Sequence, residues 1–335
     1  MPFIHACLMV AVIVQSLFIT EVKADDPAPV KSIGFGIIAT ESSNKQAAIF
    51  GPLLKDLEAS VRVPVKAFYA SDYAGVIEAM RFNKAQVAWF GNKSAMEAVD
   101  RSQGEVFAQV VGLDGSQGYY SLLITQSDSP YRSLADVLQH SHEIRFGIGD
   151  PNSTSGYLVP SYYAFAVNHV DPKTAFKRVL SSNHEGNLLS IAAKQLDVAT
   201  NNTGSLERFK QTHPEKAVLI KEIWRSVLIP SDPIVYRKDL DPALKTKIAG
   251  FFLNYGKTQG VAGERERKVL EALSWSGFIP SDNKQLLPIR QLELFLAKSR
   301  VEGDTRLSPE EKAQRLAELD AKQKLLESEI NSSTP

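Results

Sequence analysis

From residue 33 onwards, short apolar runs alternate with segments whose apolar residues have helical spacing. Three runs rich in Val, Ile and Phe predict strands at Ile33–Ile38, Val61–Ala70 and Gln86–Phe90. Apolar residues three or four positions apart predict helices at Gln46–Ser60 and Ser71–Phe82, the second capped by Asp72. Because strand and helix alternate, we expect an α/β fold with helices on the faces of a sheet.

The same alternation restarts after residue 118. Strands are predicted at Tyr119–Thr125, Ile144–Ile148 and Val198–Thr200, and helices at Ser133–His140, Ser155–Val167 and Gly186–Lys194. The stretches FNKAQVAWFGN (82–92) and AAKQLDVATNN (192–202) echo one another, each running from a helix end through Lys to Val-Ala and Asn. The echo predicts two similar lobes with a ligand cleft at the strand ends between them.

Two extended segments are placed to connect these lobes. Val227–Arg237 matches the role of Gly118–Thr125, and a hinge between lobes needs two such crossings. Helices are then predicted at Pro242–Tyr255, Gly263–Ser274 and Leu286–Leu296. We therefore divide the chain into lobe 1 (25–120 and 232–300), lobe 2 (121–231) and a C-terminal helical tail (301–335).

The tail carries its own helix signal over Ser308–Ile330. Ser308 as cap, Pro309 at the first helical position and Glu311 form a capping box. A thin stripe lies on one face of this helix, made of Leu316, Leu319, Leu326 and Ile330. The stripe fits either a terminal helix packed on one face or a self-association element, and we favour a homodimer through it.

The N-terminal segment has the pattern of a secretory signal. An apolar run from Ala6 to Ile19 is followed by Val22-Lys23-Ala24, a small-residue cleavage pattern, so we expect cleavage after Ala24. A membrane anchor is the alternative, but the run is short for a span. The single cysteine, Cys7, lies inside this segment, so the exported mature chain is expected to contain no cysteine.

Composition narrows the classes of function. Lys plus Arg and Asp plus Glu number 38 each, so no basic field indicates nucleic acid as a partner. His140 and His142 lack further ligands at metal spacing, and we expect neither a metal nor a cofactor. No G-x-S-x-G elbow surrounds the serines, and we expect no catalytic residues.

One stretch does indicate binding. GDPNSTSGYLVP (149–160) places the hydroxyls of Ser153, Thr154 and Ser155 between a turn and a predicted helix. A helix cap needs one side-chain oxygen, so a cluster of three suits an anion at a helix start; capping and turn formation alone is the other interpretation.

That stretch and six others resemble the phosphonate-binding periplasmic components of ABC uptake systems. The others are FGIIATES from Phe35, DYAG from Asp72, MRFNK from Met80, GNKSAMEAVDR from Gly91, DVATNNT from Asp197 and LIPSDPIV from Leu228. The resemblance covers about residues 33 to 300. It implies a two-lobed type II periplasmic binding protein that closes over 2-aminoethylphosphonate or a related alkylphosphonate and passes it to an ABC transporter permease.

The resemblance also implies roles for individual residues. It places the phosphonate on Ser153, Thr154 and Ser155, helped by His184, with Tyr73 and Tyr119 as cleft tyrosines and Asp232 facing the ligand's ammonium. Relatives that hold the aminoethyl ligand carry an acidic residue just after Asn-Asn-Thr, where this chain has Gly204. The advantage of 2-aminoethylphosphonate over methylphosphonate in binding this chain should therefore be smaller than in those relatives. Phosphite or phosphate binding, a sensor module and an enzyme on the same scaffold are the other functions to test.

Overall fold

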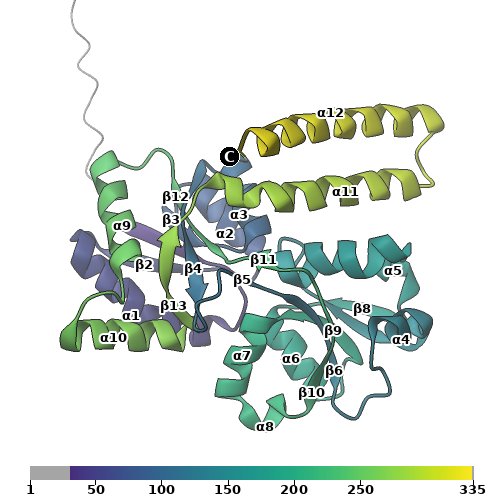
Figure 1. Cartoon of the computed structure of the whole chain (residues 1–335), viewed down its shortest axis with the longest axis horizontal. Coiled ribbons are helices and arrows are strands. Elements are labelled where there is room, and N and C mark those ends of the chain that lie inside the picture. The colour runs from purple at the N-terminus through teal and green to yellow at the C-terminus, as the bar shows by residue number, and fades with distance from the viewer. Residues whose placement is uncertain (1–30, 334–335) are drawn as a thin grey trace, which may run out of the picture. The chain divides into compact units, whose positions relative to one another are not determined.

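The computed structural model of the chain describes residues 31–333, which belong to one compact unit. Within it the elements gather around two sheets (Figure 1). The predicted signal segment, residues 1–24, lies outside the described residues. We call the elements around the six-stranded sheet the first lobe and those around the five-stranded sheet the second lobe.

The first lobe combines both ends of the chain. Its strands, in spatial order, are β13 (Trp275–Pro280), β4 (Gly104–Gly112), β12 (Pro233–Arg237), β3 (Val87–Trp89), β1 (Ile33–Ile37) and β2 (Val65–Tyr69). Strand β1 is parallel to β2 and β3, whereas β12 runs antiparallel to β3. The helices of this lobe are α1 (Ser43–Val61), α2 (Tyr73–Arg81), α3 (Asn92–Arg101), α9 (Pro242–Asn254) and α10 (Gly260–Ala272).

The second lobe is built from the middle of the chain. Its strands, in spatial order, are β10 (Ile220–Arg225), β6 (Ser121–Gln126), β9 (Val198–Asn202), β7 (Arg145–Ile148) and β8 (Arg178–Ser181). The helical segments are α4 (Leu134–Gln139), η1 (Ser141–Glu143), α5 (Pro172–Ala175), α6 (His184–Ala192), α7 (Thr203–Thr212) and α8 (Pro214–Ala217).

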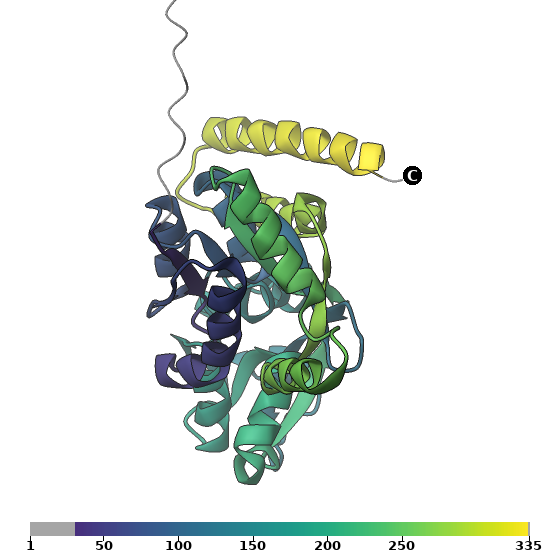
Figure 2. The ribbon, with the colours of Figure 1, turned by 90° about the vertical axis from the view of Figure 1, so that its left-hand side faces the viewer.

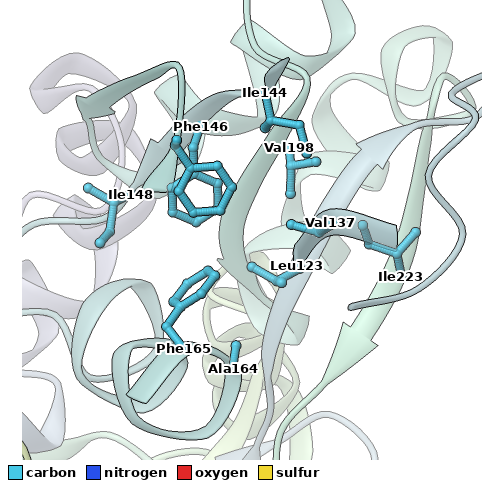
Figure 3. Packing of buried hydrophobic residues seen from close by; sticks show 10 residues of the cluster. Leu123, Val137, Ile144, Phe146, Ile148, Ala164, Phe165, Val198 and Ile223 are labelled. Carbon is cyan, nitrogen blue, oxygen red and sulfur yellow. The ribbon is translucent and has the colours of Figure 1, made fainter. Parts of the chain in front are cut away.

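An aromatic cluster fills one face of the second sheet. Phe146 of β7 meets Phe165 edge to face at 5.3 Å between ring centroids (Figure 3). Phe176 stacks on Phe146 at 4.3 Å. Leu123 of β6 and Val198 of β9 are also fully buried in this cluster. Burying side chains of this size contributes about 1.5–3 kcal/mol each, which makes the sheet a firm base for the loops at its edge.

The two lobes are joined by a short pair of antiparallel strands, β5 (Gly118–Tyr119) and β11 (Ile229–Pro230). Tyr119 is opposite Ile229, and Gly118 is opposite Pro230. These are the two extended segments that the sequence predicts as crossings. The lobe boundaries drawn from the sequence at residues 121 and 232 remain a division that we propose.

The internal echo in the sequence corresponds to a repeated structure. In both copies a helix ends, one residue takes a left-handed backbone conformation, and a central strand follows; these residues are Asn83, with φ 55°, and Lys194, with φ 56°. Strands β3 and β9 then lead into helices α3 and α7. The echo therefore predicted a real similarity between the lobes.

The regular elements largely follow the predicted pattern, with shorter strands. Asp72 caps α2 as predicted, accepting a hydrogen bond from the Gly75 amide at 2.8 Å. The strand predicted at Val61–Ala70 is wrong at its start, because Val61 ends α1 and Arg62 takes a left-handed conformation.

The helix predicted at Ser155–Val167 is wrong in type. The segment winds as η2 (Thr154–Leu158) and η3 (Ser161–Phe165), both π-type, followed by η4 (Ala166–Asn168). Pro160 has no amide hydrogen to give to the Gly156 carbonyl four residues earlier. That carbonyl instead accepts from the Gly149 amide at 2.9 Å and the Thr200 hydroxyl at 2.7 Å.

The C-terminal helix α12 (Pro309–Ser333) packs against α11 (Leu287–Gly303), which follows the short turn η5 (Asn283–Leu286). Figures 1 and 2 show the two helices side by side. The predicted capping box is confirmed, since the Glu311 amide donates to Ser308 Oγ at 3.1 Å and Glu311 Oε2 accepts from the Ser308 amide at 2.8 Å. Leu326 is buried and Lys298 pairs with Asp320, so the stripe of α12 serves contacts within the chain.

Candidate functional site

A cavity of about 430 Å³ is lined by residues of both lobes. All seven side chains predicted from the sequence as ligand-binding line it, although they come from five different segments: Tyr73, Tyr119, Ser153, Thr154, Ser155, His184 and Asp232. A volume of this size is ordinary for a small-molecule site. The fold therefore brings the predicted residues to one place.

The three hydroxyls have different local partners. Ser153 Oγ caps η2 by accepting from the Gly156 amide at 3.0 Å. Thr154 Oγ1 accepts from the Lys93 amide of the first lobe at 2.9 Å, and Ser155 Oγ accepts from Asn202 Nδ2 at 3.1 Å. Capping thus accounts for only one of the three. A hydroxyl that accepts through one lone pair still has an O–H to donate, so the cluster can offer three donors to an anion.

A close approach of two glycines shapes this loop. A Cβ placed on Gly149 would lie 2.6 Å from Gly156 Cα, so position 149 has no room for a side chain. The Gly149 amide is held by the Gly156 carbonyl at 2.9 Å. The contact turns the chain sharply after β7 and fixes the start of η2 beside the cavity. π-type turns of this kind often occur at functional sites.

His184 is neutral and its tautomer is set by Asn202. Asn202 Oδ1 caps α7 by accepting from the Ser205 amide at 2.7 Å, which fixes the orientation of its side-chain amide. Its Nδ2 therefore donates to His184 Nε2 at 3.1 Å, and the neutral ring carries its proton on Nδ1. Burial, and then the charge of Arg208, lowers the pKa of His184 to about 4. The ring is therefore a hydrogen-bonding group at neutral pH.

Tyr119 and Asp232 form a polar pair on the first-lobe side. The interaction between the Tyr119 hydroxyl and the Asp232 carboxyl lowers the pKa of Asp232 and raises that of Tyr119. Burial raises the pKa of Asp232 to about 7, although Tyr119 and the charge of Arg208 act in the opposite direction. Burial also raises the pKa of the Tyr73 and Tyr119 hydroxyls, so both stay protonated and can donate. Burial therefore disfavours the ionised form of the Asp232 carboxyl.

Arg208 is a cavity residue that the sequence analysis missed. Its Nε donates to Glu41 Oε1 at 2.8 Å, which joins α7 of the second lobe to the loop after β1 of the first. Burial alone would raise the pKa of Glu41, but Arg208 and Lys45 together hold it below its ordinary value. Helical spacing could have indicated this position. Arg208 is three residues after Ser205 on α7, so the two share a helix face, and the Ser205 amide bonds to Asn202 at the cavity.

Gly204 also lines the cavity. A Cβ added there would lie 3.5 Å from Asn202 Oδ1 and 3.7 Å from an Arg208 guanidinium nitrogen, both ordinary contacts. Its backbone is not in the left-handed region. Position 204 can therefore hold a longer side chain, which would point towards Arg208.

An aromatic wall closes the first-lobe side of the cavity and was also missed. Trp89 of β3 and Trp275 of β13 both line it, with ring centroids 5.6 Å apart. Phe50 of α1 packs against both rings, at 5.3 and 5.7 Å. Sequence patterning identifies such residues only as core, because their meeting depends on the pairing of strands from distant parts of the chain.

Two further properties concern residues 31–333 as a whole. No group of three His, Cys, Asp or Glu side chains in this part of the chain is arranged to hold a metal ion. None of its helices combines the length and the apolar character that a membrane span requires.

Comparison with known protein families identifies the family to which the sequence is similar. Residues 35–286 match the family described as ABC transporter, phosphonate, periplasmic substrate-binding protein. The phosphonates-binding periplasmic protein of Escherichia coli K12 is 50% identical over 291 residues, which cover 87% of this chain and 84% of that protein.

Solved structures agree with this result. A binding protein component of an ABC phosphonate transporter from Pseudomonas aeruginosa matches with a TM-score of 0.85 and 52% identity, covering 90% of this chain and 98% of that one. PhnD1 of Prochlorococcus marinus, in complex with methylphosphonate, matches with a TM-score of 0.70 at 20% identity, covering 79% and 98%, and shows a shared fold. The type II periplasmic binding protein fold expected from the sequence is therefore confirmed.

Proposed function

The chain belongs to the family of periplasmic phosphonate-binding proteins of ABC transporters, and from this premise we propose that its cavity captures an alkylphosphonate for uptake. The protein acts as a receptor in the periplasm and delivers the ligand to a transporter permease. It needs no chemistry of its own, because transport requires only that the ligand be held and released. Residues 1–24 direct export and are then removed by cleavage after Ala24.

The hydroxyl cluster is the observation that carries this proposal. Ser153, Thr154 and Ser155 are each only 2% exposed, yet they line the cavity and two of them have no capping role. A phosphonate has three acceptor oxygens and a negative charge, which suits three converging O–H donors. Each hydrogen bond to a charged group contributes about 1.5–3 kcal/mol. Micromolar affinity needs about 8 kcal/mol, so this cluster and the Tyr73 hydroxyl supply a sufficient set.

The neutral state of His184 also favours an anion held by hydrogen bonds. A protonated ring would bring charge but would cost desolvation, since His184 is 3% exposed. Asn202 fixes the ring beside Ser153, whose Oγ is 3.5 Å from Nε2. The phosphonate is therefore bound mainly by dipoles arranged before it arrives, and His184 positions the hydroxyls around it.

Contacts between the lobes support capture by closure. Thr154 Oγ1 bonds the Lys93 amide, Asp150 Oδ2 accepts from the Tyr73 amide at 3.2 Å, and Arg208 pairs with Glu41. Each joins a second-lobe group to a first-lobe group close to the cavity. We propose that these contacts form when the lobes close over the ligand and separate when they open around β5 and β11.

Phosphite or phosphate is the second candidate ligand. Two relatives carry such names, a probable phosphite-binding protein of Prochlorococcus marinus at 21% identity and a phosphate-import protein of Mycolicibacterium smegmatis at 26%. The cavity favours phosphonates, because an alkyl chain can pack against its aromatic wall, whereas an inorganic anion brings no apolar group to that wall. The homodimer through α12 stays a prediction without a supporting contact, since the stripe of α12 faces α11.

Calorimetry tests the choice of ligand. The purified mature protein is titrated with methylphosphonate, 2-aminoethylphosphonate, phosphite and phosphate at pH 7. We expect both phosphonates to bind at least about tenfold more tightly than the inorganic anions, a difference of about 1.4 kcal/mol. Tighter binding of phosphite or phosphate would assign the protein to inorganic anion uptake instead.

A further inference from the structure

Four polar atoms of cavity-lining residues have no hydrogen-bond partner within residues 31–333. They are Trp89 Nε1, His184 Nδ1, Asp232 Oδ1 and Ser274 Oγ, all buried. Leaving a buried donor or acceptor unpaired costs about 1–3 kcal/mol, so each such atom calls for a partner that the chain does not supply. The Trp89 side chain is itself 4% exposed. Atoms of this kind in a ligand cavity indicate which groups a ligand brings.

Strand pairing places the residues that carry two of these atoms, Trp89 and Asp232, close to each other. In the antiparallel pair of β3 and β12, Trp89 is opposite Ile234, and the Phe90 amide donates to the Pro233 carbonyl at 3.2 Å. Continuing this register sets Asp232 opposite Gly91, two residues beyond Trp89. Trp89 and Asp232 are therefore diagonal neighbours on one face, a spacing that an aromatic side chain can bridge.

Both side chains are held in place. The Trp89 indole is fixed between Phe50 and Trp275, with ring centroids at 5.3 and 5.6 Å. The Asp232 carboxyl interacts with the Tyr119 hydroxyl, and its Oδ1 has no hydrogen-bond partner in the described chain. A Cβ added to Gly91 would lie 3.8 Å from Oδ1, so the missing side chain at 91 leaves space beside it. The first-lobe end of the cavity thus presents one fixed donor and one fixed acceptor.

We infer that the ligand of this cavity is a hydroxyalkylphosphonate, whose distal hydroxyl accepts from Trp89 Nε1 and donates to Asp232 Oδ1. A hydroxyl is both a donor and an acceptor and satisfies both atoms, whereas an ammonium has only donors and leaves the Trp89 N–H unpaired. A methyl group leaves both unpaired. This inference rests on the proposed function, because it takes the phosphonate end to be held by the hydroxyl cluster of the second lobe.

The cavity has room for such a chain. A two-carbon hydroxyalkylphosphonate has seven non-hydrogen atoms. Even at the roughly 30 Å³ that a water molecule takes in the liquid, they would fill about 210 Å³, roughly half of the cavity. A three-carbon chain therefore fits as well, and both lengths belong in the test.

The test compares hydroxyalkylphosphonates with alkyl isosteres in which a methyl replaces the hydroxyl. The mature protein is titrated with 2-hydroxyethyl- and n-propylphosphonate, then with 3-hydroxypropyl- and n-butylphosphonate, and with methylphosphonate as reference. We expect the hydroxy member of at least one pair to bind about tenfold more tightly, since sites built around a hydroxyl discriminate against analogues without it. Equal affinities in both pairs, or tighter binding of 2-aminoethyl- than of either hydroxyalkylphosphonate at pH 7, would overturn the inference.

Trp89→Phe then assigns the effect, because it keeps an aromatic ring and removes the N–H. We expect this variant to lose about tenfold in affinity for the preferred hydroxyalkylphosphonate and to bind its isostere within about threefold of the parent. Trp224→Phe, at a tryptophan that packs against the core of the second lobe and does not line the cavity, is the matched control and should keep the preference. A preference that survives in Trp89→Phe would refute the role of Trp89.

The outcomes for the two proposals are separate. Loss of binding for every phosphonate, methylphosphonate included, would refute the proposed function. Intact methylphosphonate binding without any preference for the hydroxyl would refute only the inference. The isostere comparison uses the parent protein, so it decides the matter even if Trp89→Phe fails to fold.

Discussion

Arg208 and Glu41 form a buried ion pair across the cavity, 2.8 Å between Nε and Oε1, with side chains 11% and 4% exposed. Arg208 stands on α7 of the second lobe and Glu41 follows β1 of the first, so the pair exists only when the lobes are together. Glu185 of the second lobe adds two contacts to the first lobe, because its carboxylate accepts from the Ser42 amide at 2.8 Å and from Lys45 at 3.2 Å. In the closure that we propose, these charges hold the lobes together in addition to the ligand.

Glu41→Gln should weaken the binding of every phosphonate about tenfold or more. Removing one partner leaves the Arg208 charge buried and uncompensated in the closed form, whereas the open form exposes it to water. Calorimetry measures the affinity, and small-angle scattering measures how far saturating ligand compacts the protein. Glu222→Gln, which breaks the exposed pair with Arg225 inside the second lobe, is the control. Unchanged affinity in Glu41→Gln would mean that the pair does not contribute to closure.

Ser153→Ala and Thr154→Val should each weaken all phosphonates by about 1–3 kcal/mol, the cost of a hydrogen bond to a charged group. Ser153→Ala also removes a cap, which lowers stability by about 0.5–2 kcal/mol. Ser133→Ala separates the two effects, because Ser133 caps α4 by accepting from the Asp136 amide. We expect this control to lower Tm while affinity stays the same. If both cavity variants bind like the parent, the cluster only caps and turns the chain.

Much of the site could be predicted because it follows local rules. Asp72 is recognisable in the sequence as a helix cap. The three hydroxyls at 153–155 are more than one helix cap requires, and this indicated a binding role. The resemblance to the family then supplied Tyr73, Tyr119, His184 and Asp232, which the cavity brings together. Their roles in binding remain to be tested.

What the sequence could not provide depends on distant pairing. In the sequence, Arg208 looks like an ordinary charged residue of a helix. Only the fold shows that α7 lies against the loop after β1, where Arg208 pairs with Glu41. Trp89 reads as core until the register with β12 sets it beside Asp232. The π-type turns at 154–165 required knowing that the Gly156 carbonyl is taken by Gly149 and Thr200. The stripe of α12 gave no sign that its partner is α11 of the same chain.

Asp232 predicts how stability without ligand depends on pH. Its folded pKa of about 7 is above the unfolded value of 3.8, so its contribution to stability is full below pH 3.8 and is lost as pH rises through 7. Asp232→Asn removes this loss. We expect the variant to exceed the parent in unfolding free energy at pH 8, by about 4 kcal/mol at most, and to differ much less at pH 4.

Urea unfolding of both proteins at the two pH values measures this difference. Asp239→Asn provides the control, because Asp239 pairs with Arg237 away from the cavity and its pKa is lowered. That variant should lose stability at pH 8. A difference between Asp232→Asn and its parent that is the same at pH 4 and pH 8 would contradict a buried, titrating carboxyl.

Gly204→Glu should shift preference towards the aminoethyl ligand. The position borders the cavity and has room, so a carboxylate there adds a second negative partner for an ammonium. The gain in preference for 2-aminoethyl- over methylphosphonate should be about 1–2 kcal/mol, limited because the new carboxylate also faces Arg208. Gly204→Gln has the same shape without charge and should show little gain. If a well-folded Gly204→Glu discriminates no better than its parent, the ligand's distal end does not approach position 204.

The most direct test of the central claim is a crystal structure of the mature protein with methylphosphonate. We expect the lobes closed, Arg208 paired with Glu41, and the phosphonate oxygens about 2.5–3.0 Å from the hydroxyls of Ser153, Thr154 and Ser155. A phosphonate bound elsewhere in the cavity, with these hydroxyls turned to protein partners only, would contradict the account.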